Sequence, residues 1–291
     1  MLCVDPSKCI MFRAFFYLYA LSACLCIPLT TFHPTQRVLL VHSELNDDVK
    51  IALNQTGQFA EVSSFHADQG TPSLHLLSTY DVVLVWSLGP FNDSEALGNV
   101  LADYWDSGGR VVLAQYTMTP ASIFEVSRSS AELWGRFGLQ DQGYIFLKSL
   151  DDTPEYGRFT LAVPDTSPSH EILDGVDEVG QPGSVHRSAT INGGEVVAAW
   201  SNGLPLAARG LRGGRCIIAL NAFPRSIIGR EYDPLEVSGT LSYFSDLILR
   251  ERCVFMSQVG ASAPSVSRGG VRLLQNALLA CGEPAAGGLI Y

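Results

Sequence analysis

Short apolar runs alternate with amphipathic helical patterns through the first half of the chain. Residues 37–41, 81–88 and 110–115 are dominated by valine and leucine, which predicts strands buried on both faces. Residues 46–57 and 92–107 carry helix-capping residues followed by apolar side chains at helical spacing. This alternation predicts an α/β fold with a doubly wound, mostly parallel sheet. A further strand at 59–65 and a short helix at 73–80 complete the first half.

The second half of the chain is less regular. A helix is predicted at 131–137, and strands are predicted at 144–150, 159–163, 196–200, 204–209 and 215–220. Prolines and glycines punctuate residues 151–184, so loops and antiparallel additions to the sheet are expected there. A last helix is predicted to begin at Asp233, where a capping aspartate precedes a proline at the first helical position.

The first 32 residues have the layout of a secretory signal. Arg13 precedes an apolar run that reaches about Ile27, and small residues late in the run suit cleavage between Ser22 and Cys26. The alternative is an uncleaved membrane anchor, although the run is shorter than the roughly 20 residues of a span. We therefore expect three parts: a signal peptide or anchor at 1–32, an α/β domain at 33–253, and a flexible low-complexity tail at 254–291.

Two further features concern export. Asn54 and Asn92 begin Asn-x-Ser/Thr sequons, which predict N-glycosylation in the secretory pathway. Removal of the N-terminal segment leaves three cysteines, of which Cys216 lies in an apolar run and is expected to be a buried thiol, while Cys253 and Cys281 can pair. We predict that the chain is secreted or resides in the secretory-pathway lumen, or that its N-terminal segment anchors it to a membrane.

Composition and missing motifs exclude several functions. The net charge of −10 and the lack of a basic stretch argue against a nucleic-acid partner. The chain has no glycine-rich dinucleotide motif after its first strand, no phosphate-binding loop motif and no G-x-S-x-G nucleophile motif. The cysteines lack metal-ligand spacing, and the acidic residues near Glu171 fit a solvated loop face better than a cation site. No cofactor and no metal are therefore predicted.

Three stretches carry a resemblance to a known family. They are DVVLVWSLGP ending at Pro90, DYWDSGGRVVLAQ at 103–115, and a distal set that begins with HEILDGV at 170–176. Together they resemble the class I glutamine amidotransferase-like superfamily over most of residues 37–250, which implies a flavodoxin-like fold. The family's nucleophilic cysteine belongs on the turn after 110–114, where this chain reads Gln-Tyr-Thr-Met, and His186-Arg187-Ser188 stands in place of the family's His-x-Glu pair. The resemblance thus implies a domain without glutaminase activity.

The carboxyl ends of parallel strands are where a ligand is expected in such a sheet. The candidate residues of this crevice are His42, Ser43, Ser87, Gly89, Gln115, Tyr116 and Asn221. His42 can titrate near neutral pH, whereas Trp86 and Tyr116 are expected to be packing residues. No catalytic residue is assigned.

The sequence therefore favours a non-catalytic amidotransferase-like binding or scaffold domain in the secretory pathway. Its partner is expected to be a protein or a small-molecule ligand, and membrane contact is expected only through the N-terminal segment. Two alternatives stay open: a hydrolase that uses the same crevice with other residues, and a lumenal subunit of a membrane complex.

Overall fold

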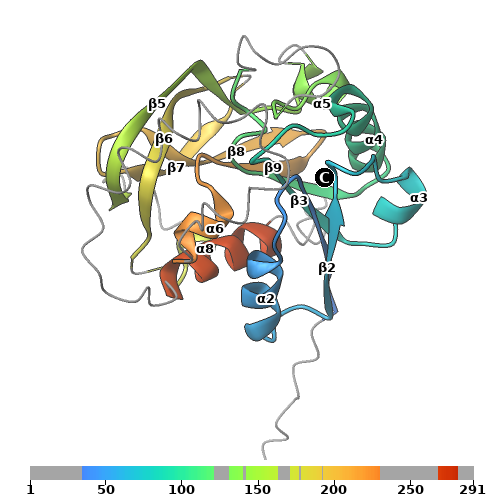
Figure 1. Ribbon diagram of the computed structural model, residues 1–291, viewed down its shortest axis with the longest axis horizontal. Helices are drawn as coiled ribbons and strands as arrows, with labels where there is room; N and C mark the ends of the chain where they lie inside the picture. The colour runs from blue at the N-terminus through green and yellow to red at the C-terminus, as the bar shows by residue number, and fades with distance from the viewer. Residues whose placement is uncertain are drawn as a thin grey trace, which may run out of the picture. The chain divides into compact units, whose positions relative to one another are not determined.

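A nine-stranded sheet in the order β2-β1-β3-β4-β9-β8-β7-β5-β6 organises the computed structural model (Figure 1). The structure describes residues 35–120, 131–139, 142–162, 171–176, 178–191, 193–229 and 268–280, without the side chains of 151–154, 156 and 181–184. All of these residues belong to one unit, Pro34–Tyr291. Within this described part, no helix is long and apolar enough to cross a membrane.

One half of the sheet is parallel. Its strands are β1 (Arg37–His42), β2 (Glu61–His66), β3 (Val82–Trp86), β4 (Arg110–Leu113) and β9 (Arg215–Leu220), and all four pairings among them are parallel. The other half is antiparallel and contains β5 (Leu147–Ala162), β6 (Gly180–Thr190), β7 (Glu195–Trp200) and β8 (Pro205–Arg212). The predicted α/β class, with parallel pairing of the first four strands and antiparallel additions in the second half, is confirmed.

Helices cover both faces of the sheet. The helices are α2 (Asp48–Gln55), α3 (Leu74–Leu77), α4 (Ser94–Asp106), α5 (Gly135–Gly138), α6 (Pro224–Ile227) and α8 (Arg268–Leu279), and η2 (Glu171–Leu173) is a single 3₁₀ turn. Helices α2, α6 and α8 pack in one hydrophobic cluster with alternate strand residues such as Leu40 and Leu84, and Figure 1 shows these helices together. Helices α3, α4 and α5 pack in a second cluster with the intervening residues, such as Leu39 and Val83. Strand side chains that alternate between two apolar faces explain why the central parallel strands β1, β3, β4 and β9 contain continuous apolar runs.

The structure differs from the expected elements in three places. Strand β5 runs without a break from Leu147 to Ala162 and pairs antiparallel with β6, so the expected antiparallel additions are present, but the break expected between strands at 144–150 and 159–163 is not. Only Gly135–Gly138 of the helix expected at 131–137 is helical. The tail expected to be flexible over 254–291 contains α8, whose Leu273, Leu274, Ala277 and Leu278 are buried in the first core cluster.

One cysteine expectation is also wrong. Cys216 is buried as expected, but it is disulfide-bonded and therefore not a free thiol. It is the only cysteine among the described residues, so its partner lies outside them. The expected N-terminal segment and the helix expected from Asp233 also lie outside the described residues.

Candidate functional site

The carboxyl ends of five parallel strands meet at one edge of the sheet. The chain also changes face here, because α2 follows β1 on one side of the sheet and α4 follows the adjacent strand β3 on the other. An edge where adjacent strands diverge to opposite faces is the usual ligand site of an open α/β sheet. All seven candidate residues from the sequence lie at this edge: His42 ends β1, Ser43 follows it, and the others follow β3, β4 and β9.

Gln115 and Asn221 form a hydrogen-bonded group beyond β4 and β9. Gln115 Nε2 donates to Asn221 Oδ1 at 3.1 Å, and the backbone N–H of His186 donates to the same oxygen at 3.3 Å. Asn221 Nδ2 donates to the carbonyls of His186 and Pro205. The Tyr116 ring packs edge-on against the His186 ring, with centroids 5.2 Å apart. Asn221 thus uses both its oxygen and its nitrogen to join β9 to β6 and β8, which is a structural role.

Ser43, Ser87 and Gly89 connect the loops after β1 and β3. Ser43 Oγ donates to the Gly89 carbonyl at 2.5 Å and accepts the backbone N–H groups of Leu88 and Gly89 at 3.2 Å. Ser87 Oγ donates to the carbonyl of Ala131 at 2.7 Å. Both serines therefore hold backbone segments together at the edge.

A buried acidic residue, Glu44, lies beside these loops. Trp86 Nε1 donates to Glu44 Oε2 at 3.0 Å, and Arg225 Nη1 lies 3.5 Å from Glu44 Oε1. Arg225 Nε also pairs with Asp48 Oδ2 at 3.1 Å, so the guanidinium is shared between two carboxylates. Burial raises the pKa of Glu44 to about 7, because desolvation of the carboxylate outweighs the Trp86 and Arg225 contacts.

His42 is stacked between aromatic neighbours. Its ring lies nearly parallel to the Trp86 ring, with centroids 4.4 Å apart, and edge-on to the His66 ring at 4.9 Å. The His42 side chain is 1% exposed, and its Nε2 has no hydrogen-bond partner among the described residues. Desolvation, followed by the proximity of His66, lowers the pKa of His42 to about 4, so the ring is neutral near pH 7.

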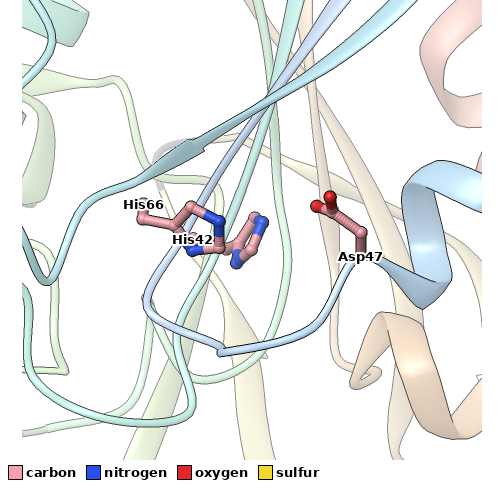
Figure 2. A group of neighbouring side chains, drawn as sticks. All are labelled: His42, Asp47 and His66. Carbon is pink, nitrogen blue, oxygen red and sulfur yellow. The ribbon is translucent and has the colours of Figure 1, made fainter.

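His66 and Asp47 face His42 from β2 and from the start of α2. Nδ1 of His66 lies 3.1 Å from the Glu44 carbonyl. Asp47 Oδ1 accepts from Ser64 Oγ at 2.6 Å, and Asp47 Oδ2 pairs with Lys50 Nζ at 3.2 Å. One ligand atom from each of His42, Asp47 and His66 lies within 4.8 Å of the other two (Figure 2).

Sequence reasoning selects His42 from this cluster but not Asp47, His66, Glu44 or Arg225. In the sequence, Asp47 is explained as part of the polar start of the helix predicted at 46–57. A usable signal exists, because His42 and His66 each directly follow a predicted strand, and adjacent parallel strands bring such positions together. No comparable signal links Glu44 to Arg225, which are 181 residues apart in the chain.

Comparisons with known proteins give only distant similarities. No protein-family model matches the chain. No curated protein matches it at a significant level.

Among solved structures, it is similar to a putative ThuA-like protein from Bacteroides uniformis, with 11% identity, a TM-score of 0.43, and coverage of 78% of this chain and 94% of that one. A glutamine amidotransferase from Thermotoga maritima has 11% identity, a TM-score of 0.45, and coverage of 84% and 96%. An exo-beta-1,4-mannosidase from an Opitutaceae bacterium has 15% identity, a TM-score of 0.39, and coverage of 77% and 35%. Similarities at these TM-scores assign neither a site nor an activity to this chain.

Proposed function

We propose that this chain is a non-catalytic amidotransferase-like domain that binds a partner or serves as a scaffold in the secretory pathway. The finer description of its fold as doubly wound and flavodoxin-like belongs to the same proposal. Support for the fold comes from the strand order β2-β1-β3-β4-β9 and from helices on both faces. Because one fold serves many functions, the case for inactivity depends on the residues at the carboxyl edge.

The observation that carries the proposal is how the hydroxyl groups at this edge are used. Ser43, Ser87 and Thr117 each donate to a backbone carbonyl: those of Gly89, Ala131 and Ala114 respectively. A serine or threonine nucleophile instead requires a hydrogen bond to a general base. The turn after β4, where the family carries its cysteine, has Gln115 and Tyr116. These side chains therefore support the local structure and leave no activated nucleophile among themselves.

Three features support export. The N-terminal segment has the pattern of a secretory signal. Asn54 and Asn92 are exposed, so both sequons are accessible to a glycan. The disulfide at Cys216 suits an oxidising compartment, because reducing compartments keep such thiols free.

A hydrolase is the second candidate, and one observation favours it. Glu44 is a buried carboxyl group at the ligand edge whose pKa is raised to about 7, and strongly shifted groups in such positions often act as general acids or bases. Against this reading, both of its oxygens already face donors, namely Trp86 and Arg225.

A turnover assay separates the two candidates. Purified protein is incubated with glutamine, and separately with chromogenic ester and glycoside substrates, beside a heat-inactivated sample. We expect no release of ammonia or chromophore above that sample. Turnover that Glu44→Gln abolishes, and that Gly70→Ala at an open surface position leaves intact, contradicts the proposal and establishes the hydrolase.

A further inference from the structure

The strongest unassigned feature is the group formed by His42, Asp47 and His66 at the ends of β1 and β2. The two histidines are register partners in the parallel pair β1–β2, and Asp47 stands directly before α2. Figure 2 shows the two rings side by side, with the Asp47 carboxylate facing them across a small space. One ligand atom from each residue lies within 4.8 Å of the others, so small side-chain movements suffice to bring all three onto a single ion.

We propose that His42, Asp47 and His66 bind a divalent transition-metal ion of the zinc class. Two imidazoles and one carboxylate suit zinc, cobalt or nickel, whereas calcium and magnesium prefer oxygen ligands alone. Three protein ligands leave a fourth position for water or for an anionic group of a ligand. This inference goes beyond the proposed function, because neither export nor scaffolding requires a cation.

The surroundings of His66 are those of a metal ligand. The Glu44 carbonyl can only accept a hydrogen bond, so the Nδ1–H of His66 donates to it at 3.1 Å. The neutral ring then presents the lone pair of Nε2. A histidine ligand is commonly oriented in this way by a backbone carbonyl bonded to its other nitrogen.

Asp47 is also held in place by its neighbours. The Ser64 hydroxyl donates to one carboxylate oxygen and Lys50 pairs with the other, and both contacts leave lone pairs available. These two residues correspond to the outer partners that orient a ligating carboxylate.

His42 supplies the independent observation that points to a ligand. Its side chain is 1% exposed and, within the part of the chain that the structure describes, its Nε2 has no hydrogen-bond partner, although a buried polar atom normally has one. The Glu44 N–H donates to Nδ1 at 3.2 Å, so the neutral ring carries its proton on Nε2. Binding of an ion at Nε2 requires the other tautomer, with the proton on Nδ1, so the Glu44 N–H must turn away from the ring and give up its 3.2 Å hydrogen bond. In return, the metal–nitrogen bond occupies the buried Nε2.

The test is metal titration of the chelator-treated full chain. Isothermal titration with zinc chloride measures affinity and stoichiometry, and cobalt absorption reports the coordination geometry. His66→Gln and Asp47→Asn each remove one ligand from a half-buried position, and His75→Gln is the matched control on the exposed surface of α3. All four proteins share the same cysteines, so any binding by thiols is constant.

We expect one zinc ion per wild-type chain, a loss of affinity of at least about tenfold in His66→Gln and in Asp47→Asn, and wild-type affinity in His75→Gln. Far-ultraviolet circular dichroism in chelator verifies that each variant is folded. If one of the two ligand variants does not fold, the zinc affinity of the other is sufficient for the test. Absence of saturable binding by the wild type, or equal affinities of the ligand variants and the control, overturns the proposal.

Discussion

The indole Nε1 of Trp86 donates a 3.0 Å hydrogen bond to Oε2 of Glu44, and both side chains are buried at the carboxyl edge of the sheet. This bond supports a carboxylate that burial otherwise disfavours. Trp86→Phe removes it, so the loss of stability is expected to be larger at pH 8, where Glu44 is ionised, than at pH 5. The pH-dependent part is expected to be about 1–3 kcal/mol.

Chemical denaturation at the two pH values measures this difference. Trp105→Phe is the control, because Trp105 is equally buried on the opposite face of the sheet and stacks on Arg215. Its stability loss is expected to be the same at both pH values. A loss for Trp86→Phe that is also independent of pH means that the hydrogen bond does not support the ionised carboxylate.

The shifted pKa values of Glu44 and His42 have opposite effects on stability. Glu44 titrates at about 7 when folded against an ordinary 4.5, so its contribution is present at low pH and is lost as the pH rises through about 7. His42 titrates at about 4 against 6.5, so its contribution is present at high pH and is lost as the pH falls through about 4. Between about pH 5 and 6.5 the two slopes oppose each other.

Glu44→Gln removes the contribution of Glu44 to the pH dependence of stability and leaves the opposing contribution of His42. In chelator, the free energy of unfolding of this variant is expected to rise with pH more steeply than that of the wild type, by up to about 1.4 kcal/mol per pH unit between about pH 5 and 6.5. Urea titrations across this window measure the slope, and Glu95→Gln on the exposed surface of α4 is the control. Parallel slopes for Glu44→Gln and wild type contradict the assigned shift.

Gly98 in α4 lies against the backbone of Trp134. A Cβ atom at Gly98 would be 1.6 Å from the Trp134 carbonyl oxygen, so an added methyl group forces backbone to move. Gly98→Ala is expected to destabilise the domain by about 1–3 kcal/mol, although alanine favours a helix over glycine by up to about 1 kcal/mol. Gly70→Ala, whose Cβ meets nothing within 4 Å, is the control in thermal and urea unfolding. Equal stability of the two variants argues against the close contact of α4 with Trp134.

The disulfide of Cys216 has an expected partner. Cys216 lies near the amino end of β9, and the last turn of α8 lies at the same edge, because Gln36 Nε2 donates to the Leu278 carbonyl just before β1. Cys281 follows this turn in the sequence, so we expect it to pair with Cys216. Non-reducing peptide mapping tests this pairing, and a Cys216–Cys253 peptide or a free Cys216 thiol disagrees with it.

The central strands of the parallel half, β1, β3, β4 and β9, could be predicted because each contains a continuous apolar run. Leu39 and Leu40 point to opposite faces and both are buried, which leaves a continuous apolar run in the sequence. Strands β5 and β6 lack this signature, since Pro154 and Pro182 lie within them. Over most of its length β5 pairs with β6 alone, at the edge of the sheet, where proline is tolerated.

The location of the candidate site could be predicted from the sequence, but most of the residues that form it could not. The carboxyl edge follows from the order of strands and helices, and His42 follows from its position after the first strand. The contacts that define its chemistry depend on register and on packing across the chain. The His42–His66 contact requires the pairing of β1 with β2, and the Glu44–Arg225 pair requires α6 to pack beside the loop after β1. The first contact is indicated only indirectly, because both histidines directly follow predicted strands, and no signal in the sequence indicates the second.

The most direct test of the exported-domain account is analysis of the protein that eukaryotic cells make from the sequence of residues 1–291. N-terminal sequencing shows whether the N-terminal segment is cleaved, and intact mass before and after N-glycosidase treatment shows whether the protein is glycosylated. The account predicts protein in the medium or the secretory lumen, with a new N-terminus produced by cleavage between Ser22 and Cys26 and with glycans on Asn54 and Asn92. Protein that stays in the cytosol, with its original N-terminus and no glycan, would contradict it.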